Sequence, residues 1–255
     1  MDCSGKTAVV AGGFGGIGYA TCNSLLSKGV KNLGIFDLFE NGDLLQKLKS
    51  NFPKANIKFW KVDATKKSEI ENGFKGAVAE FKSIDIFVTS VGVVDEMNPE
   101  RCVQINLLGT MNLNYVAIDY MSVAKGGKGG LVANVASLSG IVPFPLCVAY
   151  CATKHGIVGL TRSLGSDFYL KTTGIKFVSI CPGFTETPLL GNFAGSPVNS
   201  VKTDSAKLAQ QTAETCGKLL VEALEKDKNG SIWMIDAGKM KEIIPPEYYS
   251  GPTGT

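Results

Sequence analysis

The feature that most limits what this chain can fold into is a glycine-rich turn near its start. Residues 6–10 form a short apolar run rich in β-branched residues, and Gly12, Gly16 and Gly18 follow it closely. A helical pattern then extends through Leu26. Glycines let a backbone approach a pyrophosphate, and a helix N-terminus offers it N–H groups and a partial positive charge. A strand, a glycine turn and a helix in this order predict a dinucleotide site, although a glycine cluster alone would also suit a tight turn.

The residue that ends the second expected strand bears on the type of dinucleotide. That strand covers residues 32–37, and Asp37 is its last residue. An acidic residue about 20 positions beyond the glycine turn is where the ribose 2′-hydroxyl of NAD is bound. A carboxylate repels the 2′-phosphate of NADP, and Leu38 and Phe39 bring no positive charge to offset it. The sequence therefore favours NAD, while an ordinary exposed aspartate is the alternative for Asp37 by itself.

Strand and helix patterns alternate along the rest of the chain. Strands are expected over residues 56–62, 84–89, 131–137, 175–181 and 229–236, and helices over 41–51, 68–81, 99–122 and 203–226 and from about 148. Connections of this length suit parallel pairing. We expect a single α/β domain over residues 1–255, a doubly wound (Rossmann) parallel sheet of about seven strands with helices on both faces. Residues 184–202 are expected to form a substrate loop or lid, and residues 245–255 an irregular tail.

Polar residues stand where several of these strands end. Asp63, residues 90–92 and Ser137 occupy such positions, and ligands of open parallel sheets bind at the carboxyl ends of strands. Asn106 interrupts the apolar middle of the helix expected over residues 99–122. A buried amide needs hydrogen-bond partners, so Asn106 is either a satisfied core residue or part of a site.

Tyr150 and Lys154 form a pair that can move a proton. They are four residues apart in a helical pattern, so their side chains share one helix face. A free phenol titrates near pH ~10, and a nearby cation lowers that pKa. The pair is therefore a candidate for proton transfer at mild pH, although the same spacing is common on ordinary helices.

Composition narrows the partners of the chain. Its 26 basic and 23 acidic residues leave a net charge of +3, which is too even to indicate nucleic acid or a membrane surface. No apolar segment reaches the ~18 residues of a membrane span, and the start of the chain does not resemble a signal peptide. Seven scattered cysteines without a Cys-x-x-Cys pair and a single histidine predict no metal site and a reducing, cytoplasmic location.

Together these motifs resemble those of the short-chain dehydrogenase/reductase family. The order and spacing of the family occur in Gly12-x-x-x-Gly16-Ile17-Gly18, Asp63, Asn106, Ser137, Tyr150-x-x-x-Lys154 and Pro182-Gly183. Residues 150–163 resemble NAD-dependent 15-hydroxyprostaglandin dehydrogenases, and residues 229–233 resemble insect-type alcohol dehydrogenases and their fat-body relatives. The resemblance implies an NAD-dependent enzyme that interconverts a lipophilic alcohol, secondary or primary, and its carbonyl by hydride transfer.

The resemblance also implies a role for each matching residue. Tyr150 is expected to remove the hydroxyl proton, Lys154 to lower the pKa of Tyr150 and bind the nicotinamide ribose, and Ser137 to orient the substrate oxygen. Asn106 is expected to hold a water that links Lys154 to solvent. Cofactor contacts are expected from Gly12, Phe14, Gly16, Ile17, Gly18, Asp37, Asp63, Ala64, Val91, Gly92, Tyr150, Lys154, Pro182, Gly183, Phe184, Thr185 and Thr187. Substrate contacts are expected from Ser137, Cys147, Tyr150, Phe184 and Leu189.

The family also implies a homodimer or homotetramer built on the long helices, and Leu113, Val116 and Leu160 are expected on their outward faces. One departure from the prostaglandin dehydrogenases matters for the substrate. Cys147 stands where those enzymes carry a glutamine, and a thiol cannot make the same hydrogen bonds, which weighs against a prostaglandin. The alternative function is a catalytically weak, fat-body-type binding or storage protein. The presence of all three of Ser137, Tyr150 and Lys154 weighs against it.

Overall fold

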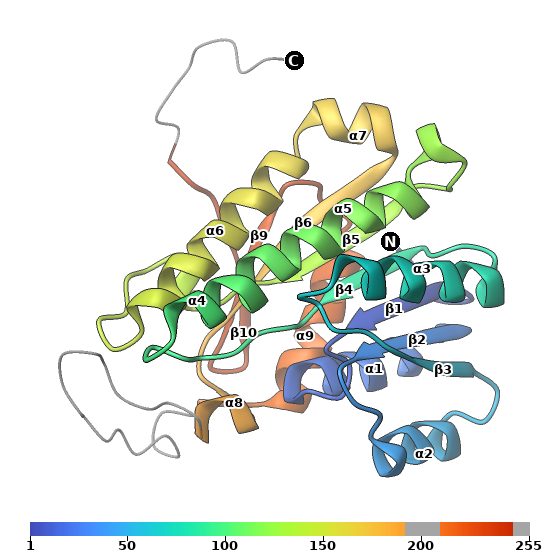
Figure 1. The fold of residues 1–255 in the computed structure, drawn as a ribbon, viewed down its shortest axis with the longest axis horizontal. Coiled ribbons are helices and arrows are strands. Elements are labelled where there is room, and N and C mark those ends of the chain that lie inside the picture. The colour runs from blue at the N-terminus through green and yellow to red at the C-terminus, as the bar shows by residue number, and fades with distance from the viewer. Residues whose placement is uncertain (192–209, 247–255) are drawn as a thin grey trace.

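The computed structural model describes residues 1–191 and 210–246. Within these residues the main sheet has eight strands in the order β10-β9-β6-β5-β4-β1-β2-β3 (Figure 1). The strands are β1 (Thr7–Ala11), β2 (Asn32–Asp37), β3 (Asn56–Lys61), β4 (Ile86–Thr89), β5 (Gly130–Val135), β6 (Ile175–Pro182), β9 (Ile232–Asp236) and β10 (Lys239–Ile243). Neighbouring strands are parallel except β9 and β10.

Helices cover both faces of this sheet (Figure 1). On one face α1 (Gly16–Ser27) packs against α9 (Ala213–Glu225), and α2 (Gly42–Asn51) buries Leu45 and Leu48 in the same core. On the other face lie α3 (Lys67–Phe81), α5 (Thr110–Met121) and α6 (Val148–Leu164). Because both faces are covered, all five residues of β1 are buried, and each fully buried aliphatic side chain contributes about 1.5–3 kcal/mol. The predicted doubly wound fold is confirmed.

The sheet has one strand more than expected. After β9 the chain reverses through Ala237 and Gly238, whose φ angles are +47° and +72°, and β10 returns antiparallel. Two consecutive residues with positive φ are typical of the tight turn of a β-hairpin. The residues of β10 are exposed or half-buried at this edge, so their sequence lacks the apolar run that revealed the other strands.

The helix expected over residues 99–122 changes its type along its length. It consists of α4 (Pro99–Cys102), a π-helix, η1 (Val103–Gly109), and then α5. The π-helix contains Asn106 at its centre, and such segments are frequent at functional sites. The structure therefore has the expected long helix over residues 99–121, and the π-helical middle is a detail that periodicity does not reveal.

The chain after β6 differs from expectation where it is described. The segment expected as a substrate loop contains the short strand β7 (Thr185–Glu186) and the short helix α8 (Pro188–Gly191). Strand β7 pairs with β8 (Gln211–Thr212), which lies beyond this segment. Residues 192–202 of the segment lie outside the described part. The last helix begins at Ala213 rather than Thr203, because the Thr212 hydroxyl caps it by accepting from the Thr215 N–H at 3.2 Å. Residues 203–209, and the predicted tail beyond residue 246, also lie outside the described part.

Before β6 the chain forms a short helix, α7 (Asp167–Thr173), which was not expected.

The described residues also contain two short 3₁₀ helices, η2 (Val123–Lys125) and η3 (Leu138–Gly140). None of the helices in the described residues is both long enough and apolar enough to cross a bilayer.

Candidate active site

The glycine turn between β1 and α1 is packed so closely that side chains are excluded from it. Gly12 has a φ angle of +76°, and a Cβ atom there would lie 2.7 Å from the carbonyl oxygen of Ser90. A Cβ atom at Gly18 would collide with the carbonyl oxygen of Gly12, and one at Gly16 would lie 2.5 Å from the Thr187 methyl carbon. Helix α1 starts with Gly15 as its N-cap and has no side-chain cap, so its first N–H groups can bind an anion.

The carboxylate of Asp37 lies beside this turn. Its Oδ2 atom accepts a hydrogen bond from the Phe14 N–H at 2.9 Å, and its Oδ1 atom accepts from the Leu38 N–H at 2.8 Å. The fold thus brings the end of β2 against the glycine turn, as the sequence predicted. The half-buried carboxylate therefore lies against the backbone of the glycine turn, and its contact with a ribose stays a prediction.

Asp63 stands at the end of the neighbouring strand, β3, and is held by local hydrogen bonds. Its Oδ1 atom accepts from the Thr65 N–H at 2.9 Å and from the Thr65 hydroxyl at 2.7 Å. Burial raises the pKa of Asp63, but the Thr65 hydrogen bonds and the nearby Lys66 ammonium outweigh burial and leave that pKa below its usual value. Asp63 is therefore anionic at neutral pH.

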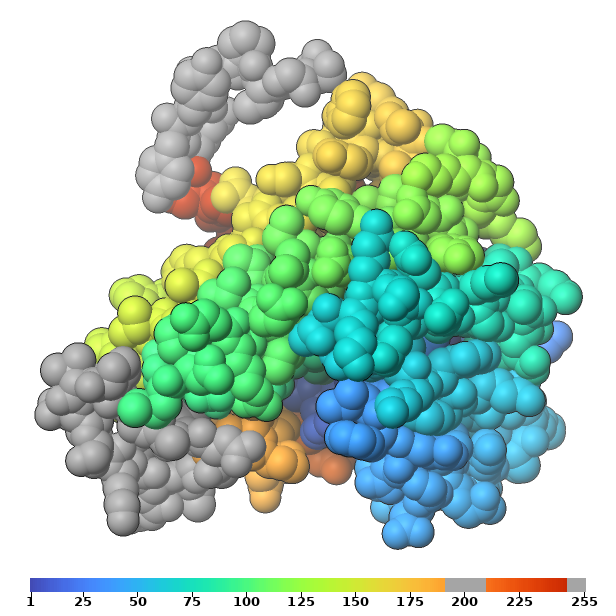
Figure 2. Space-filling view, viewed as in Figure 1, coloured from blue at the N-terminus to red at the C-terminus, as the bar shows by residue number. Residues whose placement is uncertain are grey.

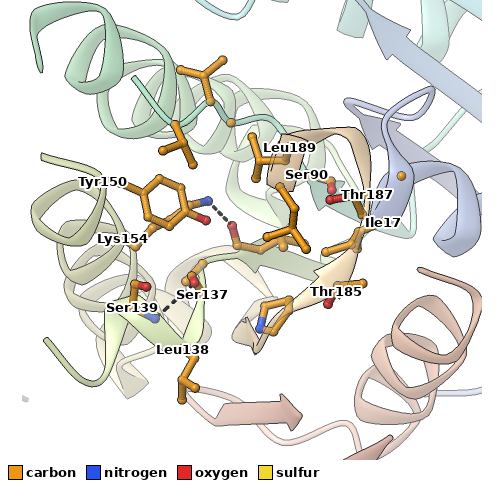
Figure 3. A pocket seen from close by; sticks show the side chains of 18 of the residues that line it. Ile17, Ser90, Ser137, Leu138, Ser139, Tyr150, Lys154, Thr185, Thr187 and Leu189 are labelled. Atoms are coloured by element: carbon orange, nitrogen blue, oxygen red, sulfur yellow. Dashed lines mark hydrogen bonds between the residues drawn. The ribbon is translucent and has the colours of Figure 1, made fainter. Parts of the chain in front are cut away.

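A cavity of about 460 Å³ opens at the carboxyl ends of the strands (Figure 3). Its walls come from the connections that follow β1, β4, β5 and β6, and from α6. It brings together the predicted residues Gly16, Ile17, Val91, Gly92, Ser137, Tyr150, Lys154, Pro182, Gly183, Phe184, Thr185, Thr187 and Leu189. Outside its walls lie the predicted residues Gly12, Phe14, Gly18, Asp37, Asp63, Ala64, Asn106 and Cys147.

Tyr150 and Lys154 share one face of α6 and line this cavity, although little of either is exposed to solvent (Figure 3). The Lys154 Nζ atom lies 5.4 Å from the centroid of the Tyr150 ring and donates to the Val135 carbonyl at 3.0 Å. Burial lowers the pKa of Lys154 to about 8, because a buried ammonium loses its hydration.

The charge state of Tyr150 differs from expectation. Burial raises the pKa of the phenol, and a hydrogen bond with the Ser137 side chain only partly offsets that effect. Lys154 was expected to lower this pKa at rest, but loss of hydration dominates. The resting phenol is therefore protonated.

Ser137 is placed by the short helix η3, which follows β5. As the N-cap of that helix, its hydroxyl oxygen accepts from the Ser139 N–H at 3.1 Å (Figure 3). The Ser137 hydroxyl also lowers the pKa of the Tyr150 phenol, although burial has the larger effect. Ser137 and Tyr150 both line the same cavity.

Asn106 is fully buried and all its polar atoms are used. Its Oδ1 atom accepts from the Val93 N–H, and its Nδ2 atom donates to the Val93 carbonyl, both at 2.8 Å. Its Nδ2 atom also lies 3.2 Å from the Thr153 hydroxyl on α6. A Cβ atom added at Gly92 would lie 3.4 Å from the Lys154 Nζ atom and 3.5 Å from the Asn106 Oδ1 atom. Asn106 is thus close to Lys154 and fixes the loop after β4, whereas its role in holding a water stays a prediction.

Cys147 was expected to contact the substrate, but it does not line the cavity. Its side chain is buried in a small cluster with Val94, Cys102 and Tyr150. Burial raises the pKa of its thiol to about 12. The apolar side chains that do line the cavity include Val94, Leu138, Val142, Phe144, Leu189 and Leu190.

Two features of the site were missed in the sequence. Arg101 donates from Nη1 to Asp95 Oδ2 at 2.8 Å, and both residues line the cavity. Glu96 is buried, and its carboxylate accepts from the backbone N–H groups of Ala149 and Tyr150. A lone glutamate in a loop has no periodicity or spacing that could have revealed a partner more than fifty residues later.

Known proteins are similar to this chain in both sequence and fold. The sequence pattern of the family described as short chain dehydrogenase matches residues 6–196. Alcohol dehydrogenase 2 of Ceratitis capitata is 34% identical over 255 residues, which cover 98% of each chain. Fat body protein 2 of Drosophila melanogaster is 31% identical over 257 residues, which cover 98% of this chain and 99% of the relative.

Among solved structures, levodione reductase superposes with a TM-score of 0.76 at 23% identity, over 92% of this chain and 97% of that chain. This likeness shows the same fold. The family pattern covers most of the chain, and the relatives align over nearly its whole length. The chain therefore belongs to the short chain dehydrogenase family.

Proposed function

We propose that this protein is an NAD-dependent oxidoreductase that interconverts a lipophilic alcohol, secondary or primary, and its carbonyl by hydride transfer. The observation that carries the proposal is the convergence of Ser137, Tyr150 and Lys154 on the cavity that the glycine turn also lines. The relatives named alcohol dehydrogenase support the same reaction class.

The residues of the glycine turn fit a nicotinamide dinucleotide. The turn has no room for side chains at Gly12 and Gly16, and the first N–H groups of α1 lack a side-chain cap. Asp37 supports NAD rather than NADP, because its carboxylate would repel a 2′-phosphate. When bound, the nicotinamide ring accepts or donates the hydride, and the protein provides position and electrostatics. Its nicotinamide end would be held by residues 182–187 and by Lys154.

Tyr150 is the proton donor or acceptor in this proposal. Its protonated resting phenol suits the reduction of a carbonyl, in which the phenol gives its proton to the substrate oxygen. Ser137 donates a hydrogen bond to the same oxygen and stabilises charge that develops on it. The Lys154 ammonium stabilises the phenolate that remains. In alcohol oxidation the same groups act in reverse.

The substrate class is proposed from the cavity wall. Its outer part is lined mainly by aliphatic and aromatic side chains, with the Arg101–Asp95 ion pair among them. An apolar wall binds an apolar substrate by releasing water, whereas a sugar would leave many hydroxyl groups unpaired. A lipophilic alcohol or ketone fits this cavity better than a carbohydrate.

The test is turnover of a panel of alcohols with NAD and of ketones with NADH, each compared with NADP(H) and followed by NADH absorbance. We expect activity with NAD, and Tyr150→Phe should abolish it while NADH still binds, because the phenol hydroxyl is lost and the cofactor cradle is unchanged. Full activity in Tyr150→Phe would contradict the assignment, and a preference for NADP would contradict the role of Asp37.

A second candidate function is a binding or storage protein, which the similarity to Fat body protein 2 favours. The same panel separates the two functions. Tight binding of NADH and of a lipophilic alcohol without turnover of any substrate would support the second candidate.

We also propose that the protein is cytoplasmic and forms a homodimer or homotetramer through the surface of η1 and α5. Leu113 and Val116, which were expected on this surface, are fully buried in the core. Val103, Leu108 and Tyr115 are exposed there instead. The segment of η1 and α5, coloured green, lies on the molecular face that Figure 2 shows. Exposed apolar side chains along one helix suit a contact between copies of the chain.

A further inference from the structure

Helix α6 carries Tyr150 and Lys154, but its own sequence does not cap its N-terminus. The N-cap residue, Cys147, makes no side-chain hydrogen bond to the first turn, and that turn contains no acidic residue. The first N–H groups of an α-helix have no carbonyl partner inside the helix. The first turn of α6 contains Tyr150 itself. Because no side chain of this turn caps it, a partner for its N–H groups has to come from another part of the chain.

Glu96 provides that partner from the loop that follows β4. Its Oε2 atom accepts from the Ala149 N–H and its Oε1 atom accepts from the Tyr150 N–H, each at 2.9 Å. Both carboxylate oxygens are therefore used, one for each donor. Hydrogen bonds to an ionised acceptor are the stronger kind, and a negative charge at a helix N-terminus is favourable.

The burial of Glu96 makes this contact unusual within the molecule. Glu96 is 5% exposed and Lys154 is 3% exposed, and they are the only buried charged side chains in residues 1–191 and 210–246. A buried charge is costly unless hydrogen bonds or an opposite charge compensate it. The two buried charges of the described chain thus flank Tyr150, one at the start of its helix and one a turn further on.

Glu96 also connects Tyr150 to the opposite side of the site. Residues 91–95 of the same loop line the cavity. This loop is fixed at Val93 by Asn106 and at Glu96 by the start of α6. The Glu96 carboxylate therefore joins the Tyr150 backbone directly to the loop that forms this part of the cavity wall.

We infer that Glu96 is a positioning residue for Tyr150, whose carboxylate holds the backbone of that residue so that the phenol meets the substrate oxygen. This inference deepens the proposed function and rests on it for its kinetic consequence. A displacement of about 1 Å in a reacting group can cost about a hundredfold in rate. The loss of the carboxylate should therefore affect turnover more than cofactor binding.

The experiment compares Glu96→Gln and Glu96→Ala with wild type. Glutamine keeps the size of the side chain but replaces one acceptor oxygen with an NH₂ group, so one of the two backbone donors loses its partner. We expect kcat to fall about tenfold in Glu96→Gln and about a hundredfold in Glu96→Ala. The Kd for NADH and the KM for the alcohol should change less than about threefold. Hydrogen–deuterium exchange should accelerate in the peptide that covers residues 148–152.

The control is Glu100→Gln, which removes one negative charge from the first turn of α4 and should behave as wild type. Three results would overturn the inference. The first is a wild-type kcat in Glu96→Gln although hydrogen–deuterium exchange of residues 148–152 is accelerated, and the second is wild-type exchange in both variants. The third is a fall in kcat that is fully explained by a smaller fraction of protein able to bind NADH. If Glu96→Ala does not fold, Glu96→Gln decides. If wild type itself turns over no alcohol, the proposed function fails, and exchange still decides whether Glu96 holds the backbone of Tyr150.

Discussion

The Lys154 ammonium lies in surroundings that oppose its charge. Burial lowers its pKa to about 8, and its Nζ atom donates to the Val135 carbonyl beside the Tyr150 ring. The neighbouring Cys181 thiol, whose pKa burial raises to about 11, stays neutral in this range. Burial also raises the pKa of Tyr150, so the phenol stays protonated. Of these groups, Lys154 is the one that changes charge near neutral pH.

This predicts how carbonyl reduction depends on pH. Below about pH 8 Lys154 is charged and stabilises the phenolate that Tyr150 leaves behind; above it the amine is neutral and that stabilisation is lost. We expect kcat for reduction to be level at lower pH and to decline above about pH 8, towards a tenfold loss per pH unit. The measurement is kcat at saturating ketone and NADH. In Lys154→Arg the guanidinium stays charged over this range, so kcat should be lower than in wild type but should no longer decline above about pH 8. A wild-type kcat that stays level up to about pH 10 would contradict the prediction.

At the scale of elements, the π-helix η1 is explained by the hydrogen bonds of Asn106. Both backbone groups of Val93 are bound by this one side chain, as in a short piece of β-ladder. The sequence identified Asn106 as a polar residue inside an apolar helix, but it could not show whether the partners were core groups or a ligand. These contacts join η1 to α6 and to the loop after β4, and local periodicity carries no information about them.

Asn106→Ala should therefore destabilise the fold. The substitution leaves the N–H and carbonyl of Val93 without their partner, and we expect a loss of about 2–3 kcal/mol in the free energy of unfolding. Urea denaturation measures it. The matched control is Asn41→Ala, which removes the exposed N-cap hydrogen bond of α2 and should cost about 1 kcal/mol. An Asn106→Ala protein as stable as Asn41→Ala would show that Val93 finds other partners.

At the scale of the whole molecule, the exposed apolar residues of η1 and α5 predict how copies of the chain associate. Leu108 and Tyr115 are 40% and 46% exposed. Lysine at these positions would place charge in the centre of the proposed contact, where charged residues are depleted. We expect Leu108→Lys/Tyr115→Lys to be monomeric in size-exclusion chromatography with light scattering, while wild type is dimeric or tetrameric.

The control for that experiment is Phe168→Lys, a similar change of an exposed apolar residue on α7. It should keep the assembly of wild type. A monomeric wild type, or a double variant that still assembles, would exclude η1 and α5 as the contact.

Some of this protein was determined by its sequence alone. The apolar strands, the glycine turn and the acidic residue at the end of β2 are local patterns, and their order specifies a doubly wound sheet with a dinucleotide site. Ser137, Tyr150 and Lys154 were identifiable because each stands next to such a pattern, at a strand end or on one helix face.

Only the tertiary structure decided the pKa values, the burial and the hydrogen-bond partners of the site residues. It buried Tyr150 and Lys154 and so moved their pKa values, buried Cys147 in a cluster instead of in the cavity wall, and brought Glu96 to the start of α6. Each of these outcomes depends on contacts between segments far apart in the chain. Desolvation and hydrogen bonding depend on which groups lie close together in the folded structure, whereas a sequence pattern shows only how far apart residues are along the chain.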